Sequence, residues 1–153
     1  MASSDYQLRC CVRDIAVIEL LFATGMRISE LCSLKPESID LESGNILIYG
    51  KGAKERVIQI GNPEVISALL LYQEYFEEDI AACGYFFVNK RKNKLSDQSV
   101  RFMIKRYAEI AGITQHITPH MFHERSTEAD NQMKPRTFVH RVRIKISVWS
   151  EKG

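Results

Sequence analysis

One stretch of this 153-residue chain decides its fold: Ala23-Thr24-Gly25-Met26-Arg27-Ile28-Ser29-Glu30-Leu31. It ends one apolar segment, turns on Gly25 and presents Arg27 just before a second apolar segment. Glycine readily adopts the left-handed conformation that closes a helix, so we expect Arg27 to project from a rigid corner. From there its planar guanidinium can grip two phosphate oxygens at once. The alternative is an ordinary ion pair with Glu30 or another nearby carboxylate.

A glycine-flanked lysine follows in Gly50-Lys51-Gly52, between two segments rich in β-branched residues. These segments, residues 46–49 and 57–60, are predicted to be strands, and Ser43-Gly44-Asn45 supplies the turn that leads into them. Two strands alone are marginally stable, so a third is expected. The candidate for it is the apolar run at residues 85–88.

A third motif, Thr118-Pro119-His120, has the composition of a helix start. The arginine, the hairpin lysine and this histidine, in this order, resemble the catalytic domain of the tyrosine recombinases, the phage integrase family, over residues 9–123. The alternative for His120 is a packed or solvent-facing histidine. The resemblance implies an α+β domain, mainly helical, with a small antiparallel sheet, of the DNA breaking-rejoining enzyme type.

The family resemblance also implies an activity: cleavage and rejoining of DNA strands, without a cofactor, through a tyrosine that becomes linked to one DNA end. It makes Arg27 a phosphate clamp, Lys51 the acid that protonates the leaving 5′ oxygen, and His120 a phosphate contact that aids proton transfer. These residue types suit phosphoryl transfer, because fixed cationic donors stabilise the charge on the phosphoryl oxygens. The alkoxide leaving group also needs a proton donor.

The second half of the family's site is missing from the sequence. The family has His-x-x-Arg after the helix start, but the fourth position here is His123. Arg125 cannot replace the arginine, because two residues along a helix rotate a side chain by about 200°. The family also has a later histidine or tryptophan in its site. His140 and Trp149 are the candidates for this position, and neither lies in a recognisable motif. No tyrosine follows His120; the tyrosines are Tyr6, Tyr49, Tyr72, Tyr75, Tyr85 and Tyr107.

Composition favours a single cytoplasmic domain without a metal site. The chain is 45% hydrophobic, enough for one ordinary core, and it has neither an apolar run of membrane-spanning length nor a signal-peptide pattern. Its four cysteines lack metal-ligand spacing and are expected to be reduced, mostly buried thiols. We also expect the family's separate N-terminal DNA-clamping domain to be absent, since residues 1–8 are too short to replace it.

The net charge of +2 gives DNA binding little general support. Residues 120–153 hold seven Lys/Arg and four Asp/Glu, a charge of +3, which leaves −1 for residues 1–119. Binding to double-stranded DNA must therefore use local basic patches, for which the alternative is an ordinary solvated surface. The expected DNA-binding residues are Lys54 and Arg56 on the hairpin, Lys90, Arg91, Lys92 and Lys94 on a turn, and Arg101, Lys105 and Arg106 on a helix.

Apolar periodicity predicts helices at residues 9–24 and 27–34, and two longer ones after the strands. The first of the longer pair begins with Asn62 as cap and Pro63, and should end near residue 79. The second is capped by Ser96 and stopped by Gly112. Their expected buried stripes are Val65, Leu69, Tyr72 and Phe76, and Val100, Met103, Ile104, Tyr107 and Ala111.

The sequence changes character after His123. We expect residues 1–123 to form a partial recombinase domain and residues 124–153 an atypical segment that is either non-native or disordered. Within it, residues 141–148 alternate charged or hydroxyl side chains with β-branched ones, which predicts a strand that pairs with its own sheet or with a neighbouring copy. The alternative is a disordered basic tail.

These features support recombination and integration of DNA by family membership, with cleavage weak or absent in this chain. Other recombinase protomers are possible partners besides DNA. Two further hypotheses are a non-catalytic DNA-binding or regulatory remnant of a mobile element, and a helical interaction module without a nucleic-acid role. Salt-dependent binding to duplex DNA would separate the last from the others.

Overall fold

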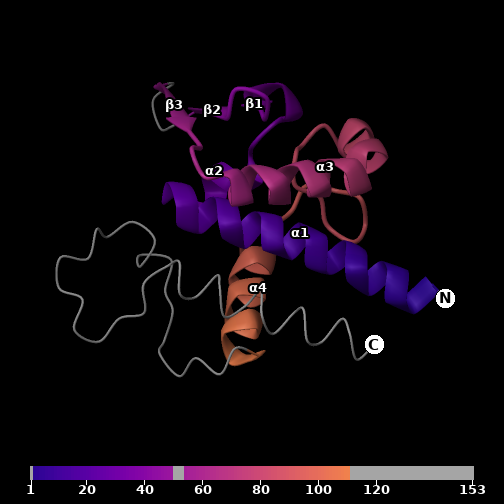
Figure 1. Cartoon of the computed structure of the whole chain (residues 1–153). Coiled ribbons are helices and arrows are strands. Elements are labelled where there is room, and N and C mark those ends of the chain that lie inside the picture. The colour runs from indigo at the N-terminus through magenta and orange to yellow at the C-terminus, as the bar shows by residue number, and fades with distance from the viewer. Residues whose placement is uncertain (1, 50–53, 111–153) are drawn as a thin grey trace, which may run out of the picture.

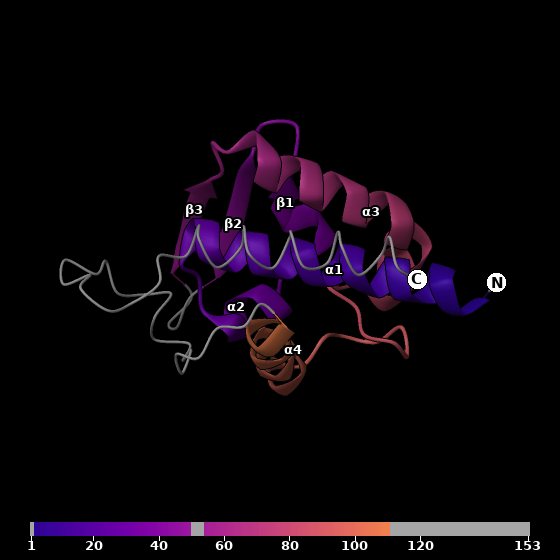
Figure 2. The same cartoon turned by 60° about the horizontal axis from the view of Figure 1, so that its bottom comes forward.

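The computed structural model of the chain describes residues 2–49 and 54–110. Helix α1 (Ala2–Thr24) runs through the middle, with α3 (Pro63–Cys83) along one side and α4 (Asp97–Ile110) crossing the opposite side (Figure 1 and Figure 2). Between α1 and α3 the chain forms a short helix, a 3-10 turn and three strands, which are α2 (Ile28–Cys32), η1 (Pro36–Ser38), β1 (Ile39–Asp40), β2 (Asn45–Tyr49) and β3 (Glu55–Gln59). The predicted fold class, mainly helical with a small antiparallel sheet, is confirmed.

Three of the sequence predictions concern the rest of the chain. The helix expected at Thr118, the strand expected at 141–148 and the atypical segment 124–153 lie outside the described residues. None of the helices within the described ranges is long and apolar enough to cross a membrane.

Helix α1 is covered on every side over its second half. Five residues there are at most 1% exposed, namely Ala16, Val17, Ile18, Leu20 and Leu21. The helix begins at Ala2 and not at residue 9 as predicted, because nothing in residues 2–8 breaks a helix once it has been nucleated. It ends as predicted at Gly25, which has φ of 67° and donates its N–H to the Leu21 carbonyl at 2.9 Å.

The sheet has the order β1-β2-β3, and both pairs are antiparallel. The turn before β2 requires a glycine: Gly44 has φ of +78°, and a Cβ there would lie 2.7 Å from the Ile60 carbonyl oxygen. The strand predicted at residues 85–88 is wrong as a member of this sheet; the third strand is β1. Phe86, Phe87 and Val88 are all buried, without the alternation of a sheet edge, and the segment makes only an isolated bridge from Val88 to Lys94.

Helices α3 and α4 are capped as predicted. The Asn62 side chain accepts a hydrogen bond from the Glu64 N–H at 2.9 Å, and Ser96 Oγ accepts one from the Ser99 N–H at 3.1 Å. The predicted stripes are buried as far as residue 107, whereas Ala111 lies beyond the described part. Helix α3 continues past residue 79 to the left-handed Gly84.

A kink at Phe76 interrupts α3, where φ is −115° and ψ is 15°. Arg9 of α1 compensates for it. Its guanidinium donates to the Tyr75 carbonyl at 3.1 Å, pairs with Asp79 at 3.1 Å and lies 4.6 Å from the centre of the Phe76 ring. The Tyr75 carbonyl, next to the kink, therefore has a side-chain hydrogen-bond partner.

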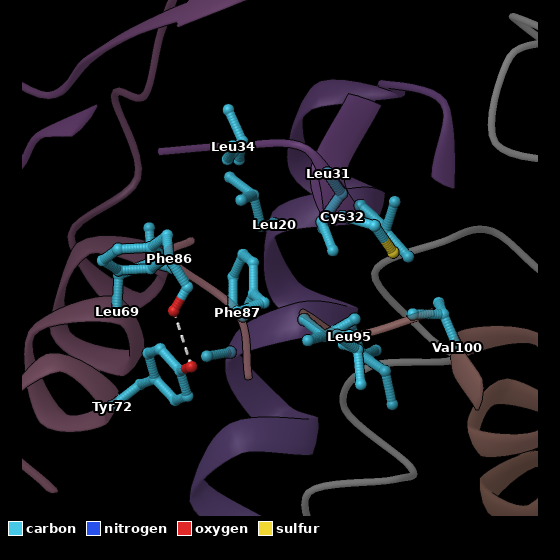
Figure 3. Close-up of a cluster of buried hydrophobic side chains, with 14 of the residues drawn as sticks. Leu20, Leu31, Cys32, Leu34, Leu69, Tyr72, Phe86, Phe87, Leu95 and Val100 are labelled. Carbon is cyan, nitrogen blue, oxygen red and sulfur yellow. Dashed lines mark hydrogen bonds between the residues drawn. The ribbon is translucent and has the colours of Figure 1, made fainter. Parts of the chain in front are cut away.

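The two outer helices are joined to α1 in different ways. On the α3 side there is an aromatic cluster, in which Tyr72 of α3 packs against Phe86 and Phe87 of the segment that follows the helix (Figure 3). The centre of the Tyr72 ring lies 5.3 Å from that of Phe86 and 5.1 Å from that of Phe87. Helix α4 is held by a buried polar contact: the Tyr107 hydroxyl donates to Asp14 Oδ2 at 2.6 Å. Burial raises the pKa of Tyr107 and Asp14 raises it further, so the phenol stays protonated as a donor. Arg13 pairs with the other Asp14 oxygen at 2.9 Å.

The four cysteines, all within the described part, form no disulfide. Cys11 and Cys32 are buried, and Cys10 and Cys83 are half-buried. Burial, reinforced by neighbouring Asp97, raises the pKa of Cys32 to about 12. This thiol is therefore neutral at physiological pH and is a packing residue.

Tyr72→Phe should destabilise the domain by about 2 kcal/mol, because two buried backbone groups lose their partner. The Tyr72 hydroxyl donates to the Phe86 carbonyl at 2.7 Å and accepts from the Val88 N–H at 3.1 Å. Urea unfolding measures the loss. Tyr49→Phe is the matched control, since Tyr49 is 59% exposed and its change should be near zero. Equal effects of the two substitutions would contradict a bridging role for Tyr72.

Candidate nucleic-acid interface

Arg27 projects from the corner between α1 and α2. The chain turns at Gly25, Met26 is fully buried beneath the turn, and Arg27 follows in extended conformation with φ of −72° and ψ of 148°. Its carbonyl accepts the Leu31 N–H at 3.0 Å, which starts α2. The backbone of Arg27 is therefore fixed on both sides while its side chain is exposed.

Glu30 binds the backbone of Arg27 and the side chain of Arg56. One carboxylate oxygen accepts the Arg27 N–H at 2.9 Å. The two oxygens also receive both terminal nitrogens of Arg56, at 2.9 and 3.0 Å. Burial alone would raise the pKa of Glu30, but the hydrogen bonds from Arg27 and Arg56 outweigh it and lower that pKa below its usual 4.5. Glu30 thus stays ionised at neutral pH.

This arrangement bears on the two interpretations of Arg27. The alternative was an ion pair between Arg27 and Glu30 or another carboxylate. Within the described ranges, the ion pairs of at most 4.0 Å do not include the Arg27 side chain, and Glu30 is paired with Arg56 instead. Among the described contacts, the Arg27 guanidinium therefore has no ion-pair partner.

Strand register brings Arg56 to Glu30. Arg56 lies opposite Ile48 in the β2–β3 ladder, and Ile58 lies opposite Ile46. These two pairs are two positions apart, so all four side chains are on the same face of the hairpin. Ile46 and Ile48 are buried, so Arg56 lies on the face of the hairpin that turns toward the core and α2. Sequence reasoning missed this pairing. The available signals were the period-two position of Arg56 and the capping position of Glu30, three residues after Arg27.

The other two expected catalytic residues, Lys51 and His120, lie outside the described residues, as do His123 and the C-terminal stand-ins. The structure does describe the strand ends on either side of the hairpin tip, which are Tyr49 at the end of β2 and Glu55 at the start of β3. It therefore places the base of the lysine hairpin beside α2, and leaves the convergence of the three residues a prediction.

The expected DNA-binding residues fall into separate regions. Lys54 is exposed directly before β3, and Arg101 and Lys105 are exposed on α4, which packs against α2. The turn that carries Lys90, Arg91 and Lys92 lies at the other end of α1, away from the sheet (Figure 2).

Two ion pairs show that the turn at residues 90–92 lies near Arg9, far along α1 from Arg27. Lys92 Nζ lies 3.8 Å from Asp79, and Asp79 also pairs with Arg9 near the start of α1. Arg9 lies fifteen residues before the end of α1 at Thr24, and a helix rises 1.5 Å per residue, so its backbone is about 22 Å along the helix from the corner that carries Arg27. The structure does not bring the turn residues to the Arg27 corner.

Replacing Glu30 by glutamine should lower the free energy of unfolding at pH 7 by about 1 kcal/mol, because the amide can still accept the Arg27 N–H but loses the charge that pairs with Arg56. The wild type is more stable than Glu30→Gln above pH 4.5, the usual pKa of the carboxyl. This difference in the free energy of unfolding is lost as the pH falls through the lower pKa that Glu30 has in the folded state. Urea unfolding over a pH series measures it.

The control for this series is Glu37→Gln, because Glu37 is exposed and belongs to no ion pair in the described part. Its difference from wild type should be small at every pH. A difference between wild type and Glu30→Gln that stayed constant into acid would show that the carboxylate charge contributes nothing.

Comparison with known proteins identifies the domain. The profile of the phage integrase family matches residues 3–142. A tyrosine recombinase of Agathobacter rectalis is 53% identical over 121 residues, which are 79% of this chain and 40% of that protein. The chain thus spans less than half of this relative's length.

Two solved structures share the fold. The XerA recombinase superposes with a TM-score of 0.62 at 29% identity, over 73% of this chain and 41% of that one. The XerH site-specific recombinase, bound to difH substrate in a pre-cleavage complex, gives a TM-score of 0.66 at 24% identity, over 92% of this chain and 46% of that one. The family profile, which matches most of the chain, shows that the chain belongs to the phage integrase family of tyrosine recombinases.

Proposed function

We propose that this chain is a DNA-binding part of a tyrosine recombinase that acts in integration and site-specific recombination, and that Arg27 binds a DNA phosphate. The observation that carries the proposal is the exposed guanidinium of Arg27 on a fixed backbone, beside a carboxylate already paired with Arg56. A cation held in this way loses little entropy on binding phosphate.

Family membership supports DNA as the partner. The XerH recombinase, which shares this fold, was crystallised bound to difH substrate. Lys54, Arg101 and Lys105 are exposed on elements near the Arg27 corner and are proposed as further phosphate contacts. The basic turn at residues 90–92 would contact DNA only at a second point along the duplex, because it lies at the far end of α1. Such a protein would act in the cytoplasm.

Within the family's reaction, we assign Lys51 to protonation of the leaving oxygen and His120 to a phosphate contact. The chain has no tyrosine after His120, and His123 occupies the position of the second arginine. We therefore propose that this chain binds DNA without cleaving it. No cofactor is required by the assigned roles.

His123 at the position of the second arginine also favours a second candidate, a non-catalytic or regulatory remnant of a mobile element that occupies recombination sites or pairs with other protomers. In either role, residues 124–153 are proposed to be an atypical segment by composition, although the family profile extends to residue 142. A nicked DNA substrate separates cleavage from binding alone.

Arg27→Ala should weaken binding to duplex DNA several-fold and leave the fold intact, because an exposed phosphate ligand contributes little to stability. Fluorescence anisotropy with labelled duplex measures the affinity, and thermal unfolding measures the fold. Lys35→Ala is the matched control, since Lys35 is exposed and outside the proposed interface. If Arg27→Ala lowered thermal stability in step with affinity, Arg27 would be a structural residue.

This chain should form no covalent adduct with a nicked suicide DNA substrate, since no tyrosine lies after His120. Denaturing gel electrophoresis with radiolabelled DNA detects an adduct, and a full-length recombinase of the family serves as the positive control. A protein–DNA linkage mapped to any residue of this chain would overturn the assignment of binding without cleavage.

A further inference from the structure

We propose that Arg56 positions the β2–β3 hairpin against α2 through Glu30, and does not itself bind DNA. The proposal deepens the DNA-binding function proposed above, because it separates two arginines that the sequence presents as equivalent phosphate ligands. Arg27 would contact the phosphate, and Arg56 would hold the hairpin beside it.

The geometry of the Arg56 guanidinium supports a positioning role. Both of its terminal nitrogens are bound to the Glu30 carboxylate, at 2.9 and 3.0 Å, in the parallel arrangement that satisfies both groups. The Glu30 side chain is only 10% exposed. A phosphate that recruited Arg56 would have to break both bonds and leave this enclosed carboxylate with the Arg27 N–H as its remaining partner.

The pair lies where the hairpin needs an anchor. The inner side of the hairpin is held by Ile46, Ile48 and Ile58, whereas Tyr49 and Val57 on its outer side are 59% and 64% exposed. In the described chain, the Arg56–Glu30 pair is the hydrogen-bonded contact that joins β3 to α2. Arg56 lies one register position from Tyr49 and Glu55, the strand ends on either side of residues 50–54.

One carboxylate therefore fixes two elements at once. Glu30 holds the backbone of Arg27 on one side and β3 on the other, so the position of the hairpin relative to Arg27 depends on this group. Loss of Arg56 should loosen the hairpin while the helical core stays intact, because local opening follows the local contacts.

Hydrogen–deuterium exchange on the chain without DNA tests the anchor. Arg56→Gln and Glu30→Gln should each speed exchange in the hairpin segments 45–49 and 54–59 by about 3- to 10-fold. Exchange in α1 and α3 should stay unchanged. Arg56→Lys should restore part of the protection, since a lysine keeps the charge but not the two-point contact. Lys54→Gln is the matched control on the same hairpin and should have no effect on exchange.

The salt dependence of DNA binding tests the second half of the proposal. Removal of a phosphate contact lowers the slope of log K against log salt by about 0.9. Arg56→Gln should weaken binding and leave this slope unchanged, whereas Lys54→Gln, which removes an exposed cation, should lower it. Unchanged hairpin exchange in Arg56→Gln, or a slope lowered by about 0.9, would overturn the positioning role. The exchange measurement needs no DNA, so it decides this role even if the chain fails to bind duplex.

Discussion

The burial of α1 on all sides is the constraint on which the rest of the structure depends. Ala16, Val17, Leu20 and Leu21 are fully enclosed, so no single neighbouring layer can cover the helix. Helix α3 covers one side through the aromatic cluster, and α4 covers the other. The buried Asp14 is stable there because Arg13 and the Tyr107 hydroxyl both bind it, and this contact fixes α4 on the side where α2 begins.

The end of α1 places the candidate interface. Gly25 stops the helix, the buried Met26 locks the turn, and Glu30 binds the backbone at the start of α2. One carboxylate holds the Arg27 backbone and the Arg56 side chain, which gives two nearby arginines opposite properties. Arg56 is expected to stabilise the structure, and Arg27, which belongs to no ion pair among the described residues, is proposed to bind a phosphate.

Local sequence rules predicted most of the elements. Asn62-Pro63 and Ser96 start helices where capping chemistry places them, and Gly25 ends one, because each rule acts within a single turn. The prediction of residues 85–88 as the third strand was wrong for a physical reason. Apolar runs are shared by strands and by extended core segments, and only packing tells them apart. Phe86 and Phe87 pack beside Tyr72 in the helical core, and the short β1 takes the sheet position.

The sequence by itself determined the family, the helical framework and the corner that presents Arg27, because motif order, capping residues and glycines act locally. It also determined that no tyrosine follows His120. Only the tertiary structure decided which arginine side chain pairs with Glu30. Glu30 and Arg56 are 26 residues apart, and they meet because strand register turns Arg56 toward α2. Charge pairing across such a separation depends on the packing of three elements, and no local pattern encodes it.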